Sequence, residues 1–147
     1  MMHAKNLDEA MTIWRTTNNT LGMNFMISSA PDVPSGQPAV AMETMRGYTA
    51  FFRDNDSREN QTMFVDPKTH KKYEAGHSMK NAVFRTNHAY DPTIREHMRS
   101  SQIPEDDDSM IRYQLLSKAF KWYEDQGITM GPEQSLNLTA VMGDKGS

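Results

Sequence analysis

The sequence predicts an α+β fold with a mainly antiparallel sheet. Three observations predict it: an amphipathic helical segment opens the chain, several short segments rich in strand-forming residues follow it, and the longest helical segment comes near the end. Elements that are grouped in this way, rather than alternating helix with strand, are typical of α+β domains. No internal repeat is visible in the 147 residues, a length that suits one domain.

The first expected element is a helix that begins at Leu7. Asn6 can cap it, and acidic residues in its first turn complement the positive end of the helix dipole. Its apolar residues share one face at helical spacing: Leu7, Ala10, Met11 and Trp14. We expect the poor helix formers Thr16–Asn19 to end it.

Five further segments are predicted to be strands, because strand formers or alternating apolar residues dominate them. They are Met23–Ser29, Ala39–Met45, Tyr48–Phe52, Thr62–Val65 and Asn81–Thr86. The proline-rich segment Ala30–Pro38 is predicted to be a loop, and Arg46-Gly47 can turn the chain between the second and third strands. Between the later strands, the charged segment Asp54–Asn60 is expected to be an exposed turn or a helix start, and the polar segment Lys68–Gly76 a surface loop or ribbon.

The last third of the chain is predicted to be helical. A short helix is expected at Thr93–Arg99 and the longest one at Met110–Gln126, where Gly127 can close it. Pro132–Gln134 can start another helix before Leu136–Met142. The acidic run Glu105–Ser109 suits a helix start and lacks the spacing of a calcium-binding loop.

One residue of the long helix is chemically unusual. At about 100° per residue, the polar face holds Gln114, Ser117, Lys118, Lys121, Glu124 and Asp125, and the apolar side holds Leu115, Leu116, Ala119, Phe120, Trp122 and Tyr123. Arg112 projects onto the apolar side. A guanidinium keeps its proton, so burial there requires a carboxylate or an oxyanion as partner. Alternatively, Arg112 lies in the first turn and reaches solvent past the helix end.

Composition excludes several functional classes. With 16 Lys+Arg against 19 Asp+Glu, the chain has no basic excess for nucleic acid. We expect no transmembrane segment, since no apolar run approaches roughly 18 residues, and no secretory signal at Met1–Ala10. The absence of Cys excludes disulfides, thiolate zinc sites and a cysteine nucleophile within this chain. The five His lack the spacing of a helical zinc motif, and we expect no metal or cofactor.

Four glycosylation sequons favour a secretory route, and they begin at Asn18, Asn55, Asn60 and Asn137. No Gly-x-Ser-x-Gly elbow, phosphate-binding glycine loop or dinucleotide fingerprint is present. The residues taken one by one therefore do not identify an activity.

Four segments taken together are more informative. In chain order they are Gly22–Ala30, Ala39–Glu43, Arg85–His88 and Asp108–Arg112. Their order and spacing resemble the middle of the acid ceramidase-like and penicillin (isopenicillin-N) acyltransferase family of N-terminal-nucleophile (Ntn) hydrolases. The resemblance runs from about Leu7 to Ser147, and the stretch Asn81–Pro92 is typical of the acid ceramidase-like branch.

The resemblance implies a four-layer αββα sandwich and assigns roles to residues. In this family autoproteolysis exposes an N-terminal cysteine, whose thiolate attacks an amide or thioester carbonyl with its own amino group as base. Thr86-Asn87-His88 matches the motif whose Asn donates to the oxyanion, so Asn87 is the oxyanion-hole candidate. Asp108–Arg112 matches an acidic run followed by the arginine of the same pocket, which makes Arg112 the second catalytic candidate. Glu43 matches a family Glu and is expected to be structural or to line the pocket.

The missing cysteine is the main departure from the family. We therefore expect residues 1–147 to be a single partial domain, a middle segment that lacks the nucleophile-bearing segment and the C-terminal strands. The expected function is that of a fragment of a cysteine amidohydrolase or acyltransferase for N-acyl small-molecule or lipid substrates, inactive alone, whose partner is the nucleophile-bearing segment of the same enzyme. Two alternatives stay open: a non-catalytic relative that binds lipid or peptide in the same pocket, and a phospholipase-B-like lipid hydrolase. The family, like the sequons, favours a secreted or lysosomal location.

Overall fold

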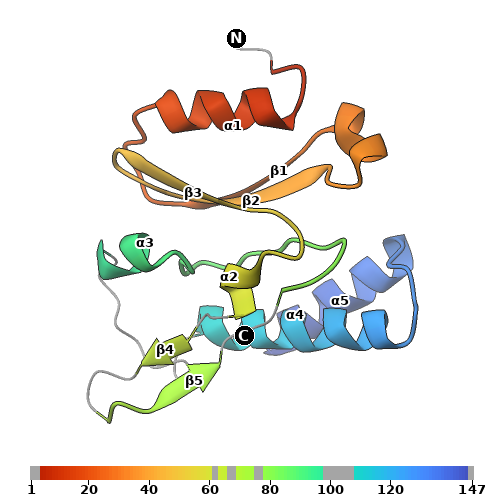
Figure 1. The fold of residues 1–147 in the computed structure, drawn as a ribbon. Helices are drawn as coiled ribbons and strands as arrows, with labels where there is room; N and C mark the ends of the chain where they lie inside the picture. Colours follow the sequence, from red (N-terminus) through yellow and green to blue (C-terminus); the bar gives the residue numbers. More distant parts are fainter. Residues whose placement is uncertain (1–3, 61–62, 66–68, 75–77, 98–107, 146–147) are drawn as a thin grey trace. The chain divides into compact units, whose positions relative to one another are not determined.

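The structure is a computed structural model that describes residues 4–60, 63–65, 69–74, 78–97 and 108–145. It confirms the predicted α+β class, with a three-stranded antiparallel sheet, a two-stranded ribbon and several helices (Figure 1). The chain divides into two compact units. The first comprises Met1–Asp56 with Ser78–Arg99, and the second comprises Ser57–His77 with Ser100–Ser147.

The first unit is built on the sheet β1-β2-β3, formed by Asn24–Ser28, Ala39–Met45 and Tyr48–Phe52. All three strands were predicted and are confirmed, as is the turn between β2 and β3, where Gly47 has a φ of 76°. Glycine adopts this left-handed conformation without steric cost. The register places Asn24 on β1 and Ala50 on β3 opposite Glu43 on β2.

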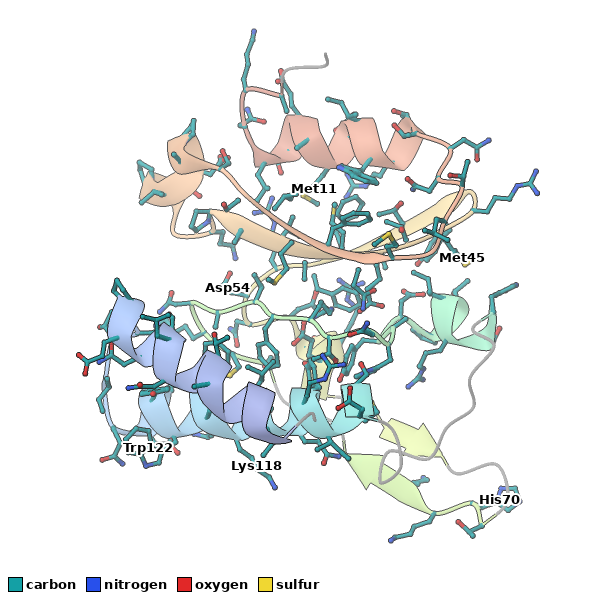
Figure 2. The ribbon with its side chains drawn as sticks, turned by 180° about the vertical axis from the view of Figure 1, so that it is seen from behind. Met11, Met45, Asp54, His70, Lys118 and Trp122 are labelled. Carbon is teal, nitrogen blue, oxygen red and sulfur yellow. The ribbon has the colours of Figure 1, made fainter. Side chains whose placement is uncertain are left out.

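The central strand β2 is buried on both of its faces, since every residue from Val40 to Thr44 is buried. Neighbouring residues of a strand point to opposite faces, so Val40 and Met42 share one face and Ala41 and Glu43 share the other. Helix α1 (Leu7–Thr16) covers the first face (Figure 1). The Met11 side chain lies on the side of α1 that faces the sheet (Figure 2). The apolar core of this face consists of Leu7, Met11, Val40 and Met42, with Trp14, Phe25, Ile27 and Phe51 packed against it.

Two side chains hold the start of α1. The predicted cap is confirmed, because the Asn6 side chain accepts a hydrogen bond from the Glu9 backbone N–H at 2.8 Å. The Asp32 carboxylate accepts a second one from the Leu7 N–H at 2.7 Å. Asp32 lies in a short 3-10 helix, η1 (Ala30–Ser35), so the loop prediction was wrong for this part of Ala30–Pro38. Proline suits the first helical positions because its φ is already helical there, and Gly36 ends η1 with a left-handed φ of 78°.

The charge of Asp32 makes the stability of the first unit depend on pH. Hydrogen bonds from Ser29 and from the Leu7 backbone N–H lower the pKa of Asp32. A lowered carboxyl pKa stabilises the fold above the ordinary pKa of an Asp, and this stabilisation is lost as the pH falls through the lowered value. We expect Asp32→Asn to lower the Tm near neutral pH and to leave it unchanged at strongly acid pH, as measured by circular dichroism. An equal loss of Tm at both pH values would contradict a role for the charge.

The second unit contains the elements α2 (Ser57–Asn60), β4 (Met63–Val65), β5 (Lys72–Glu74), α4 (Asp108–Asp125) and α5 (Pro132–Lys145). The strands β4 and β5 pair antiparallel. The predicted long helix is confirmed as α4, and the predicted helix start at Pro132 is confirmed as the start of α5, which continues through Leu136–Met142. Thr62, Lys68, Gly76, Arg99 and the run Glu105–Asp107 lie outside the described residues. No helix in the described ranges is both long and apolar enough to cross a membrane.

The predicted faces of α4 are wrong in part. Ser117, expected on the polar face, is buried, whereas Trp122, expected on the apolar side, is 53% exposed. The buried residues of this helix are Ser109, Met110, Tyr113 and Ser117. The Tyr113 hydroxyl donates to Glu59 Oε2 at 3.3 Å, and the two small serines lie one helical turn before and after the tyrosine. A hydropathy projection misses such a stripe because its members carry hydroxyl groups.

Candidate functional site

Glu43 is the centre of a polar cluster on the sheet face opposite α1. Its side chain is completely buried, and Oε1 accepts a hydrogen bond from Arg85 Nε at 2.8 Å. Oε2 accepts two more, from the backbone N–H groups of Tyr90 at 2.7 Å and Asp91 at 2.8 Å. One carboxylate therefore fixes both the side chain of Arg85 and the backbone at Tyr90 and Asp91.

Arg85 is buried with Glu43, and only 2% of its side chain is exposed. Its guanidinium lies over the rings of Phe52 and Tyr90, 4.4 and 5.2 Å from the ring centroids, and Nη1 donates to the Phe84 carbonyl at 2.7 Å. Burial raises the pKa of the Glu43 carboxyl, while the Arg85 charge and the N–H groups of Asp91 and Tyr90 act to lower it. Both Glu43 oxygens face donors of the protein itself, which supports the structural role expected for this residue.

Asn24 holds the loop that carries the oxyanion-hole candidate. It lies opposite Glu43 in the register of β1 and β2. Its Nδ2 donates to the carbonyl of Thr86 at 2.6 Å and to that of His88 at 2.8 Å. These two carbonyls flank Asn87, whose side chain is exposed. The chain is thus clamped on both sides of Asn87.

Further hydrogen bonds stiffen the same loop. The His88 ring is buried, with Nε2 2.7 Å from the Tyr90 hydroxyl and Nδ1 3.2 Å from Thr86 Oγ1. Asp91 Oδ1 accepts from the backbone N–H of Ile94 at 3.1 Å, which ties the end of the loop to helix α3 (Pro92–His97). These hydrogen bonds fix the backbone around Asn87, and a fixed backbone is one condition for a side chain there to stabilise charge in a transition state.

The strand predicted at Asn81–Thr86 is wrong, because the structure assigns no strand to these residues. Two of its carbonyls accept hydrogen bonds from side chains, Phe84 from Arg85 Nη1 and Thr86 from Asn24 Nδ2. Side chains therefore donate to these two carbonyls, to which the backbone N–H groups of a neighbouring strand would donate in a sheet.

Arg112, the second catalytic candidate, lies on α4 in the second unit, whereas Asn87 belongs to the first. Its Nη2 and Nε lie 2.8 and 3.0 Å from Asp108 Oδ2, one helical turn earlier. The Arg112 side chain is 28% exposed. It is therefore ion-paired within its own helix and reaches solvent, rather than being buried on an apolar side.

Sequence reasoning missed the roles of Asn24 and Arg85. Asn24 alternates with Met23 and Phe25, so its place on the polar face of the strand could be predicted, but its partners could not. Among the described residues, no group of three or more His, Asp or Glu could hold a metal ion.

A scan against protein-family models gives no match to this chain, and neither curated proteins nor solved structures match it significantly.

The clamp on Asn87 can be tested by replacing Asn24. Asn24→Ala removes two hydrogen bonds and leaves two part-buried carbonyls without this donor, so we expect the free energy of unfolding to fall by about 1–3 kcal/mol. Amide hydrogen exchange of Thr86–His88 should accelerate as well. The control is Asn19→Ala, which removes a single hydrogen bond to Thr49 Oγ1 in the same unit. Unchanged exchange in Asn24→Ala would show that the loop does not depend on this clamp.

Proposed function

We propose that this chain supplies the oxyanion-binding part of a cysteine Ntn amidohydrolase or acyltransferase of the acid ceramidase-like and penicillin acyltransferase family. One observation carries the proposal: an exposed asparagine, Asn87, lies on a loop whose two flanking carbonyls are held by Asn24. Three of the four segments that carry the family resemblance supply this cluster, since Asn24, Glu43 and Arg85 each come from a different one. The substrates would be N-acyl small molecules or lipids.

In the proposed reaction the nucleophile comes from another segment of the enzyme. A cysteine thiolate attacks the carbonyl carbon of the N-acyl substrate, and the electron pair of the C=O bond moves to the oxygen. The Asn87 amide donates a hydrogen bond to this oxyanion, and its fixed backbone spares the reorganisation that a mobile donor would need. The cysteine's own amino group, which took the thiol proton, gives it to the amine nitrogen; the C–N bond then breaks, the amine leaves, and the acyl group remains as a thioester for hydrolysis or transfer.

Arg112 and the sheet complete the proposal. Arg112 enters the proposal through the family resemblance; Asp108 engages its Nε and Nη2 within α4, which fixes the direction of the guanidinium. Helix α1 and the sheet β1-β2-β3 would form one helical layer and one sheet layer of an αββα sandwich. The other layers would include the nucleophile-bearing segment and further C-terminal strands.

The proposal is tested by supplying the cysteine. The 147-residue chain should not hydrolyse a fluorogenic N-acyl amide alone, but should do so when it is co-expressed with the in-frame coding sequence upstream that places a Cys at the start of a strand. Replacing that Cys with alanine should abolish the restored turnover. Hydrolysis by the isolated chain would contradict the cysteine mechanism, and a stable but inactive complex would favour the non-catalytic relative.

A further inference from the structure

We propose that a cavity in the first unit binds an aliphatic primary ammonium group, with Asp54 as its counter-ion. The cavity has a volume of about 180 Å³ and is lined by residues 36–39, Asp54 and residues 81–83. Asp54 follows strand β3 (Figure 2). The cavity includes neither Asn87 nor Arg112, so the inference does not depend on the proposed function.

Two hydrogen bonds build the wall around Asp54. Asp54 Oδ2 accepts from the Asn81 backbone N–H at 3.1 Å, and the Asn55 N–H donates to the Met79 carbonyl at 2.6 Å. They join the end of β3 to the segment from Met79 to Asn81. The carboxylate is therefore held in place when the cavity is empty, and binding would not need to order it.

The other carboxylate oxygen of Asp54, Oδ1, lacks a hydrogen-bond donor among the described residues. Oδ1 is buried, and within the described ranges of the chain it has no hydrogen-bond partner. A buried acceptor without a donor is unfavourable and rare in native proteins. A ligand that donates to Oδ1 would satisfy it, and a positively charged donor forms the stronger hydrogen bond.

The remaining walls select the kind of cation. Pro38, Ala39, Ala82 and Val83 contribute apolar side chains, which suit an alkyl chain. Pockets for drug-sized ligands measure about 300–1,000 Å³, so this cavity suits a smaller molecule. A hard metal cation is bound by several oxygen ligands, and among the described residues no group of three or more His, Asp or Glu could hold a metal ion. A compact ammonium group with a short alkyl chain carries the positive charge that Asp54 can pair with, and it fits the volume of the cavity.

The experiment titrates the whole chain with n-butylammonium chloride at constant ionic strength and follows backbone amide shifts by NMR. We expect saturable shifts at Asn81, Ala82 and Val83, and none with n-butanol, which has a similar length but no charge. Asp54→Asn should weaken binding at least about tenfold, while its remaining oxygen can still accept from the Asn81 N–H. Ala82→Leu fills the cavity without touching the carboxylate and should also weaken binding.

The control is Asp125→Asn, which removes the same charge from an exposed residue of α4 that is already paired with Lys121. It should leave the Kd for butylammonium unchanged. The proposal is overturned if butanol produces the same shifts, if no shift saturates, or if Asp54→Asn binds as tightly as the wild type. If Asp54→Asn fails to fold, as seen from the loss of amide dispersion, Ala82→Leu decides in its place.

Discussion

Replacing Asn87 with alanine is expected to lower kcat of the cysteine-supplemented enzyme by about 10²–10³, the loss typical of one oxyanion donor. The Asn87 amide would meet the developing negative charge only in the transition state, so kcat should fall more than the KM changes. The side chain is exposed and Asn24 fixes the backbone beside it, so the free energy of unfolding should change by less than about 0.5 kcal/mol. Initial rates at saturating substrate and urea unfolding of the same preparations measure the two quantities.

Two matched variants sharpen this result. Asn87→Asp keeps the shape of the side chain but replaces the donor with an acceptor, so it should lose as much activity as Asn87→Ala. Asn137→Ala removes another exposed amide, from α5, and should be fully active. In the same assay Arg112→Ala should lower kcat at least about tenfold. Full activity in both Asn87→Ala and Arg112→Ala would show that the site assignment is wrong.

The sheet of the first unit could be predicted because its signals are local. Alternating apolar residues mark β1, and the turn between β2 and β3 depends on Gly47, whose left-handed φ needs no distant contact. The cap of α1 is equally local, since Asn6 bonds to an N–H three residues away. Where the residues of an element specify it on their own, the prediction from the sequence pattern agrees with the structure.

The errors occur where distant side chains decide the local structure. Residues 81–86 have a strand-like composition, but Asn24, 62 positions earlier in the chain, donates to the Thr86 carbonyl. Ser117 is buried on a stripe of α4 whose central Tyr113 donates to Glu59, 54 positions earlier in the chain. A periodicity calculation on one segment contains neither partner.

In the candidate site, too, local motifs could be predicted from the sequence, whereas contacts between distant residues could not. Asn87 and Glu43 could be selected from short motifs, but the function of Asn24 depends on a contact between residues 62 positions apart in the chain. That contact follows from the register of β1 on β2, which places Asn24 beside Glu43. A register is set by the pairing of whole strands, so no single motif could reveal that one polar face anchors the loop.

The buried ion pair beneath this loop is expected to give the largest effect on stability. Glu43→Gln removes the charge that faces the Arg85 guanidinium, and one amide oxygen replaces two carboxylate oxygens that together accept three hydrogen bonds. Removing one partner leaves a charge buried without compensation, so we expect the free energy of unfolding to fall by about 3–5 kcal/mol. Urea denaturation followed by circular dichroism measures this change.

A double-mutant cycle separates the ion pair from the general effect of altering a buried site. Arg85→Met removes the guanidinium and keeps an unbranched apolar side chain over Phe52, so the double variant with Glu43→Gln should be more stable than the sum of the two single losses predicts. Asp8→Asn is the control. It breaks the ion pair between Asp8 and Arg53 in the same unit, in which the Asp8 side chain is 84% exposed. This variant should lower the free energy of unfolding by less than about 1 kcal/mol. Strict additivity of Glu43→Gln and Arg85→Met would mean that the two charges do not stabilise one another. The anchor of the Asn87 loop would then consist of the hydrogen bonds from Tyr90 and Asp91 to Glu43 and the clamp by Asn24, without a contribution from charge.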